Sequence, residues 1–179
     1  MKAHYFDIET YSPNEIPNPE TDRIITIQFQ KIDLETGEPI GKLQILKEWE
    51  DGEKEILKLF HTWFLKTNPW KFIPIGFNLL FEWKFLSYKL KEHKIDNKNL
   101  ENFIEEFPQI DLKTIAILKN GTFKGASLSS ITNKSENGDI IKQLYEQKEY
   151  TKIENYIKQE AKEFINLYKK TKEILGKEL

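Results

Sequence analysis

The chain has 179 residues, 39% of them hydrophobic and 31% charged, and a formal net charge of -2. The length suits one domain (residues 1–179) with a substantial core, and the near-neutral charge excludes strong bulk attraction to nucleic acid or anionic membrane. The chain contains no cysteine, which excludes disulfides and thiolate zinc sites. No apolar run is long enough to cross a bilayer, and no N-terminal signal peptide is recognised, so we expect a cytoplasmic protein that does not act in a membrane.

The N-terminal third of the sequence predicts a three-stranded meander. Residues 3–8 and 23–30 are rich in β-branched and aromatic side chains, and a loop rich in Pro and Asn separates them. A turn at 34–39 leads into a third strand at 42–49. From Asp51 onward, apolar residues recur at helical spacing as far as Phe64. The pattern therefore predicts antiparallel strands followed by an amphipathic helix.

The rest of the chain predicts further helices around at least one more strand. The short apolar run 72–76 reads as that strand. Asn78 is a plausible N-cap for a helix that ends near residue 93. Further helical segments are predicted at 96–106, 111–118, 128–131 and 151–175, and the segment 133–138 is polar. The alternation predicts an α/β fold, with a mixed sheet and helices packed on it.

Two acids close to the N-terminus carry the first chemical signal. Asp7 and Glu9 lie two residues apart in the first predicted strand, so both side chains point to the same face of the sheet. Two carboxylates held this close repel each other unless a cation lies between them. A polar strand edge that runs into a turn is the simpler explanation of this pair alone.

Two later segments provide further acids. Glu82 lies four residues after Asn78, and Glu160 lies four residues after Tyr156, so each pair shares one helix face. Taken singly, each glutamate is more simply explained as a solvated helix residue. Together with Asp7 and Glu9, they form an ordered series of acidic motifs.

This series resembles the three motifs of the DEDD superfamily of 3′-5′ exonucleases. The matching segments are Asp-Ile-Glu-Thr at 7–10, Gly-x-Asn-x-x-x-acid at 76–82 and Tyr-x-x-x-acid at 156–160. The likeness spans residues 5 to about 170, and it is greatest to the proofreading exonuclease domains of B-family DNA polymerases and their stand-alone relatives. The histidine subtype needs a histidine in its third motif, and none follows His93. The tyrosine subtype is therefore the one that this chain resembles.

The resemblance implies a ribonuclease-H-like fold, with a central five-stranded mixed sheet flanked by helices. It also implies two divalent cations, about 3.5–4 Å apart, held by Asp7, Glu9, Glu82 and Glu160. Carboxylate oxygens select Mg²⁺ or Mn²⁺. In this family pattern Tyr156 would hold or orient the attacking water.

The chain departs from the family at two of these positions. The family usually has Asp in the second and third motifs, whereas this chain has Glu82 and Glu160. The longer side chains leave three outcomes open: a compensating shift of the backbone, a weakly bound second metal, or low activity. Tyr150 and Glu154 offer a rival Tyr-x-x-x-acid motif, and Asp111 either caps a short helix or lies near the metals.

Several further residues are candidates for contacts with the substrate. Thr10 and Tyr11 follow the first two acids directly, and Asn78 could hydrogen-bond the strand, although a helix cap explains it equally well. Phe77 and Phe81 could stack on bases, although burial in the core is the commoner fate of such aromatic residues. The lysines at positions 84, 89, 91, 94 and 98 either follow phosphates or form a solvated helix face.

We therefore expect an enzyme: a metal-dependent 3′-5′ exonuclease that hydrolyses single-stranded DNA and releases nucleoside monophosphates. The expected partners are the 3′ end of a single strand and a replication or repair protein. Three alternatives stay open at this stage. One is an RNA 3′-end exoribonuclease, because the metal chemistry barely involves the sugar. The second is a catalytically weak nucleic-acid-binding module of the same fold, and the third is a protein–protein interaction domain that merely retains the fold.

Overall fold

The computed structural model describes residues 2–14, 16–122, 128 and 139–178. Five strands form one mixed sheet in the order β3-β2-β1-β4-β5. β1 pairs with β2, and β2 with β3, in antiparallel fashion, whereas β4 runs parallel to both β1 and β5. The strands are β1 (Ala3–Tyr11), β2 (Arg23–Ile32), β3 (Pro39–Lys47), β4 (Ile73–Gly76) and β5 (Ile110–Asp111).

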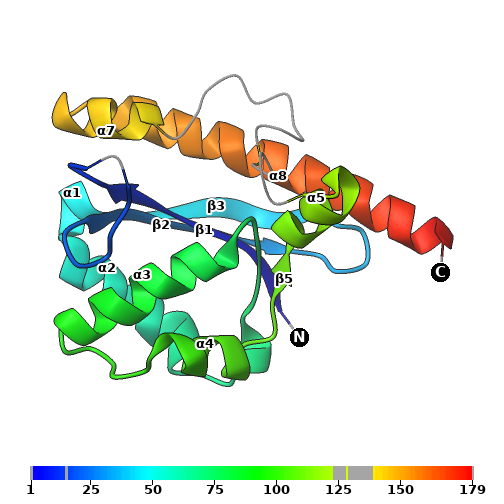
Figure 1. The fold of residues 1–179 in the computed structure, drawn as a ribbon, viewed down its shortest axis with the longest axis horizontal. Coiled ribbons are helices and arrows are strands. Elements are labelled where there is room, and N and C mark those ends of the chain that lie inside the picture. The colour runs from blue at the N-terminus through cyan, green and yellow to red at the C-terminus, as the bar shows by residue number, and fades with distance from the viewer. Residues whose placement is uncertain (1, 15, 123–127, 129–138, 179) are drawn as a thin grey trace.

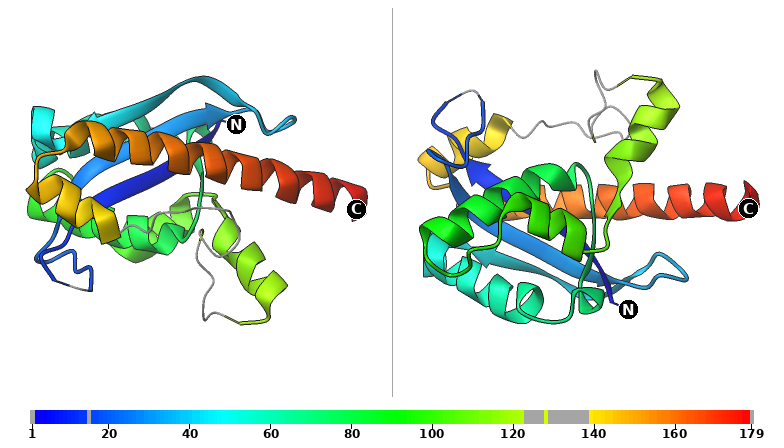
Figure 2. Two further views of the ribbon diagram at one scale, coloured as in Figure 1. Left: turned by 90° about the horizontal axis from the view of Figure 1, so that it is seen from above. Right: turned by 60° about the horizontal axis from the view of Figure 1, so that its bottom comes forward.

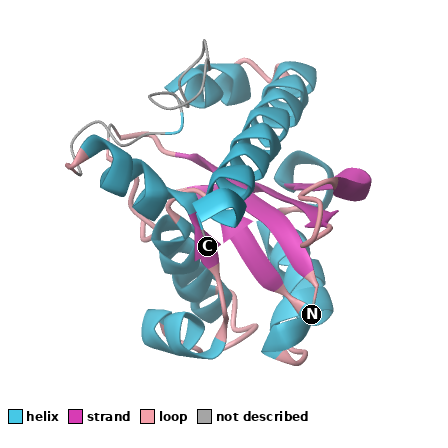
Figure 3. Cartoon of the chain, turned by 90° about the vertical axis from the view of Figure 1, so that its right-hand side faces the viewer, coloured by secondary structure: helices cyan, strands magenta, loops and turns pink. Residues whose placement is uncertain are grey.

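Helices cover both faces of this sheet (Figures 1 and 3). α2, α3 and α4 pack on one face, and α7 and α8 lie along the other. The helices are α1 (Glu48–Asp51), α2 (Glu53–Phe60), α3 (Leu79–Glu92), α4 (Leu100–Glu106), α5 (Leu112–Asn120), α7 (Asp139–Glu146) and α8 (Tyr150–Glu178), with a π-helical turn η1 (His61–Leu65) after α2 and a 3₁₀ turn η2 (Pro69–Lys71). This arrangement confirms the predicted α/β class and the ribonuclease-H-like fold.

An aromatic core fills the face of the sheet under α2 and α3. Phe6 is fully buried and stacks on Phe60 with ring centroids 5.1 Å apart. Phe72 and Trp83 complete the contacts of the Phe6 ring, at 5.6 and 5.7 Å. Burying several large rings together is the main source of stability that this face can provide.

The opposite face of β1 packs against α8, the longest helix in the described part of the chain. Tyr5 lies against Phe164 of α8, with ring centroids 5.1 Å apart. Ala161 and Ile165 are buried in the same cluster. Figure 2 shows that α8 runs along the sheet and continues past its edge. The contact with Tyr5 fixes the part of α8 that precedes Phe164 over the C-terminal half of β1.

Several element boundaries differ from those predicted. The third strand ends at Lys47, and residues 48–51 form the short helix α1. α4 begins only at Leu100, because Asn99 and Asn102 form a reciprocal capping box there. Residues 139–146, for which no element was predicted, form α7. Apart from Leu128, the predicted segments 128–131 and 133–138 lie outside the described residues.

None of the helices in the described part of the chain combines the length and the apolar character needed to span a bilayer.

Candidate active site

Three predicted metal ligands converge at the C-terminal half of β1. Asp7 and Glu9 of β1 and Glu160 of α8 each offer a carboxylate oxygen, and these oxygens lie within 4.8 Å of one another. All three side chains are half-buried. The structure therefore brings together acids that lie more than 150 positions apart in the sequence.

The pleat of β1 and the packing of α8 together create this convergence. Tyr5, Asp7 and Glu9 alternate with Phe6 and Ile8 along the strand, so they face α8 while the apolar pair faces the aromatic core. The register of β1 on β2 shifts between Glu9 and Thr10. A shift of this kind locally bends a strand, so the bend in β1 follows directly after Glu9.

Asp7 is held by hydrogen bonds that sequence reasoning did not identify. The Tyr5 hydroxyl and the Gln28 amide each donate to Asp7 Oδ2, both at 3.2 Å. Gln28 lies directly opposite Asp7 in the β1–β2 register, and Thr26 Oγ1 donates to Gln28 Oε1 at 2.8 Å. The signal was present in residues 24–30, where Thr26, Gln28 and Gln30 alternate with apolar residues. It could be recognised only once the pairing of the strands was known.

Burial and mutual repulsion make this centre costly without a cation. Burial and, next, the charge of Glu160 raise the pKa of Asp7 from 3.8 to about 7. Burial also raises the pKa of Glu82 well above its usual range, and the charge of Asp7 adds to that effect. A divalent cation would lower both pKa values again, because its positive charge stabilises the ionised form of each carboxyl.

Glu82 lies in the first turn of α3 and is only 3% exposed. Its side chain shares a hydrogen bond with Asp7. Its other oxygen, Oε2, is buried and has no hydrogen-bond partner in the described part of the chain. Among the described residues, the group with oxygens within 4.8 Å of one another consists of Asp7, Glu9 and Glu160, so Glu82 adjoins this group through Asp7.

Tyr156 lies one helical turn before Glu160 on α8, as the sequence spacing predicts. It is buried between the side chains of α7 and β2, and its pKa is raised by burial and then by the charges of Glu9 and Glu160. A hydrogen bond joins it to Glu160. The Tyr156 hydroxyl is therefore part of the acidic centre.

The rival motif at Tyr150 and Glu154 is directed elsewhere. The Tyr150 ring stacks on Trp49, with centroids 4.7 Å apart and planes 6° from parallel. Glu154 accepts from Lys47 Nζ at 3.1 Å. Tyr150 therefore packs on α1 and Glu154 pairs with the end of β3, so both side chains tie the start of α8 to the segment 47–49.

Asp111 caps two helices at once beside the acidic centre. Its carboxylate accepts from the backbone N–H groups of Asn78 and Leu79, at 2.8 and 2.9 Å, and from that of Lys113 at 2.9 Å. These N–H groups belong to the starts of α3 and α5. Asp111 also contributes to the raised pKa of Glu82. The capping role is the one that the structure assigns to Asp111, and it fixes the helix turn that carries Glu82.

Asn78 is not the side-chain cap that the sequence suggested. It has left-handed backbone angles (φ 72°, ψ 42°), and its side chain makes no capping hydrogen bond. Its Oδ1 instead accepts from Lys113 Nζ at 2.8 Å. The cap of α3 is provided instead by Asp111 of β5. Because Asp111 lies more than 30 residues further along the sequence, the residues around Asn78 could not predict this cap.

The other predicted substrate contacts are already engaged in packing or hydrogen bonds within the fold. The Tyr11 hydroxyl donates to Glu146 of α7 at 3.1 Å, and Thr10 is half-buried beside it. Phe81 packs on Phe85 at 4.7 Å, and Phe77 packs against the cluster under α8.

The stretch of lysines after Glu82 is partly bound within the fold. Lys89 is 4% exposed, and its Nζ donates to Glu92 at 2.8 Å. Lys98 forms an ion pair with Glu106. Both contacts agree with a structural role for these two lysines and leave fewer charges for phosphate binding.

The residues present suit a hard divalent cation. Asp7, Glu9 and Glu160 supply carboxylate oxygens only, which favours Mg²⁺ or Mn²⁺ over metals that prefer sulfur or imidazole ligands. The buried Oε2 of Glu82, which has no partner among the described residues, offers a further oxygen next to Asp7. The donor set thus fits the metal chemistry that the resemblance implies.

Two solved structures with the same fold are a DNA polymerase and an exonuclease. The chain superposes on the family B DNA polymerase of the archaeon Pyrobaculum calidifontis with a TM-score of 0.59 and 15% identity, over 94% of this chain and 24% of the polymerase. It superposes on the metal-free form of the Escherichia coli exonuclease I complex with single-stranded DNA with a TM-score of 0.54 and 14% identity, over 74% of this chain and 34% of the exonuclease.

The chain spans about a quarter to a third of the length of these proteins. The expected likeness to exonuclease domains is thus confirmed at the level of the fold. No protein-family model and no curated protein sequence matches the chain.

Proposed function

We propose that the protein is a metal-dependent 3′-5′ exonuclease that shortens single-stranded DNA and releases nucleoside monophosphates. The observation that carries this proposal is the convergence of Asp7, Glu9 and Glu160 within 4.8 Å, with the buried carboxyl of Glu82 beside Asp7. The likeness of the fold to exonuclease I and to a family B polymerase supports it.

Each of these residues has a distinct role in the proposed reaction. Asp7, Glu9, Glu82 and Glu160 would hold two cations, Mg²⁺ or Mn²⁺. Such ions, when bound, generate a hydroxide nucleophile and stabilise the charge on the scissile phosphate and the leaving 3′-oxygen. The Tyr156 hydroxyl, joined to Glu160, would hydrogen-bond the attacking water and set its direction. Tyr5 and Gln28 would orient the Asp7 carboxylate.

The surroundings of the centre suit the end of a single strand. Thr10 and Tyr11 follow Glu9 along β1, and Phe77, Asn78 and Phe81 precede Glu82 at the start of α3. Aromatic rings and polar groups in this position would hold the terminal nucleotides with little dependence on sequence. A replication or repair protein would be the natural source of such strand ends.

The direct test is the digestion of 5′-labelled single-stranded DNA, and separately RNA, with Mg²⁺, with Mn²⁺ or with chelator. We expect a ladder that shortens from the 3′ end, needs metal and disappears in Asp7→Ala, whose folding is checked by circular dichroism. More efficient digestion of RNA would identify an exoribonuclease instead. Binding without shortening in either metal would contradict the proposal.

One observation favours a second candidate, a nucleic-acid-binding module with weak catalysis. Glu82 lies outside the group of three convergent carboxylates among the described residues, so the fourth ligand is the least well placed of the set. Tight binding of single strands with no metal-dependent cleavage would identify that function.

A further inference from the structure

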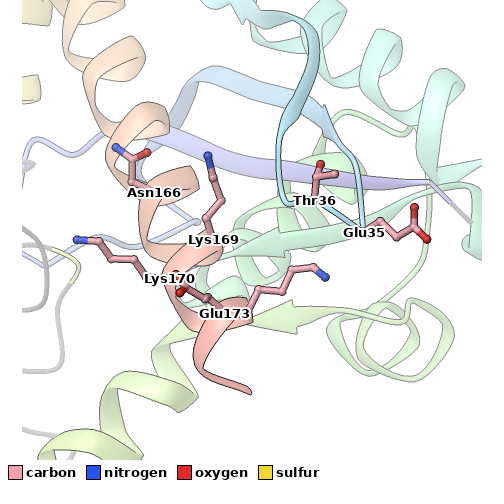
Figure 4. A pocket seen from close by; sticks show the side chains of 7 residues that line it. Glu35, Thr36, Asn166, Lys169, Lys170 and Glu173 are labelled. Atoms are coloured by element: carbon pink, nitrogen blue, oxygen red, sulfur yellow. The ribbon is translucent and has the colours of Figure 1, made fainter. Parts of the chain in front are cut away.

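A groove runs along the flank of α8 that faces away from the acidic centre. Its larger part has a volume of about 530 Å³ and lies between α8 and the turn that joins β2 to β3 (Figure 4). Its smaller part has a volume of about 260 Å³ and lies between α8 and β3. Asn166 and Lys169 line both parts, so the two hollows lie next to each other along α8 and together make up the groove.

Lysines dominate the charge of this groove. Five of them line it, against three glutamates, in a protein whose net charge is -2. The lysines are at positions 158, 162, 169, 170 and 172 and the glutamates at 35, 38 and 173. Lys169 pairs with Glu38, and Lys158 lies 3.6 Å from Glu154. Lys162 is exposed and forms no ion pair with another described residue, so its charge is available to an external anion.

The length and the floor of the groove suit a chain of phosphates rather than a single anion. Positions 158 to 172 extend over about 21 Å of helix, at 1.5 Å per residue. Leu43, Ala161 and Ile165 provide an apolar floor between the lysines. A single-stranded nucleic acid offers both features, because it carries regularly spaced phosphates and apolar faces of sugar and base.

The position of the groove relative to the acidic centre indicates which part of a strand it would hold. Lys158 and Lys162 each lie two residues after Tyr156 and Glu160, a rotation of about 200° around the helix. The groove and the centre therefore lie on opposite flanks of α8. The terminal nucleotides at the centre cannot occupy the groove at the same time, whereas a more distant part of the same strand can.

We propose that this groove binds the phosphate backbone of single-stranded nucleic acid upstream of the 3′ end. This inference rests on the proposed function for the identity of the strand. Binding in the groove would keep a long substrate attached between successive cleavages. Long oligonucleotides would therefore gain affinity that short ones lack.

The test measures binding of a 30-nucleotide and a 6-nucleotide single strand in chelator, so that no cleavage is needed. In Lys162→Glu/Lys169→Glu we expect the long strand to bind roughly tenfold more weakly and the short strand to bind as before. The slope of log K against log salt should fall by about 1.4 for the long strand, because two phosphate contacts are lost. Glu38→Gln, which releases Lys169, should tighten long-strand binding.

The matched control is Lys54→Glu/Lys66→Glu, which makes the same change of charge at two exposed positions near α2, on the other face of the sheet. We expect it to leave the difference between long and short strands intact. Equal loss in both double variants would show a general charge effect and overturn the proposal. So would unchanged binding in Lys162→Glu/Lys169→Glu at an unchanged thermal midpoint. The assay does not measure cleavage, so its result is independent of the proposed nuclease activity. A protein without nuclease activity could still bind a strand in the groove, and an active nuclease could lack this binding.

Discussion

The two faces of strand β1 differ in what they contribute to the protein. On one face, Phe6 is fully buried and its ring packs against those of Phe60, Phe72 and Trp83. On the other, Asp7 and Glu9 lie beside Glu160, and burial and the charge of Glu160 raise the pKa of Asp7. The comparison indicates that packing on the aromatic face stabilises the fold and offsets the cost of burying the carboxylates on the acidic face.

The largest expected effect comes from breaking the aromatic face. Phe6→Ala removes a fully buried ring and should lower the free energy of unfolding by about 3–5 kcal/mol, measured by urea denaturation. Trp70→Ala is the control, because Trp70 is 57% exposed and should cost less than about 0.5 kcal/mol. Similar losses in both variants would contradict the assignment of stability to this face.

The acidic face should behave in the opposite way. Asp7 has a pKa of about 7 in the folded protein and 3.8 without its surroundings. Between those two pH values the unfolded chain has already released a proton that the native state keeps, so the stability of the metal-free protein falls as the pH rises through this range. Asp7→Asn removes this fall and should be more stable than the wild type at pH 8 without metal, by a few kcal/mol.

Two features of the surroundings shape this experiment. Glu82, Glu160 and Tyr5 all face Asp7, so the measured difference belongs to the centre as a whole. His4 has a pKa lowered from 6.5 to about 4 by burial, so its contribution is lost as the pH falls from 6.5 toward 4, the opposite sign. Because His4 is common to both proteins, the difference between them isolates the centre. Parallel pH profiles for wild type and variant would contradict the account.

The double cap links the two faces, and its loss should have an intermediate effect. Asp111→Ala leaves three backbone N–H groups without their acceptor, which should cost about 1–3 kcal/mol of stability. Because Glu82 lies in the turn that Asp111 holds, nuclease activity should fall more than the fraction of folded protein. Asp111→Asn, which keeps an acceptor oxygen, should recover part of both. Activity that simply follows the folded fraction would show a purely structural role.

The smallest expected effect concerns the length of one side chain. Glu82→Asp shortens the carboxylate that lies outside the group of three described acids and introduces the residue that the exonuclease family which the sequence resembles usually has there. We expect stability to change by less than about 1 kcal/mol and nuclease activity in Mn²⁺ to be retained or raised. A collapse of activity would show that the centre is built around the longer acid.

The sequence predicted those parts of the molecule that depend on local pattern. Alternation in residues 3–8 and 23–30 located β1 and β2, and the spacing of Tyr156 and Glu160 located the third acidic motif. β5 was not predicted because its two residues are too few to show a period. Residues 139–146 were not predicted as a helix, since the segment adjoins a polar stretch.

The contacts that set the chemistry were the hardest to predict, because they join distant elements. Gln28 reaches Asp7 across the β1–β2 ladder, and Asp111 caps α3 from β5. Neither interaction follows from the residues next to it in the sequence. The sequence motifs identified the acids of the centre, whereas the residues that orient them, Gln28 and Asp111, could be identified only from the fold.

The central claim is that the acidic face of β1 forms a metal site, and a titration of Mn²⁺ at pH 8 by isothermal calorimetry tests it most directly. We predict two ions per chain for the wild type, and for Asp7→Asn a loss of at least one of them at unchanged folding. Absence of binding by the folded wild type, or an identical titration in both proteins, would contradict the claim.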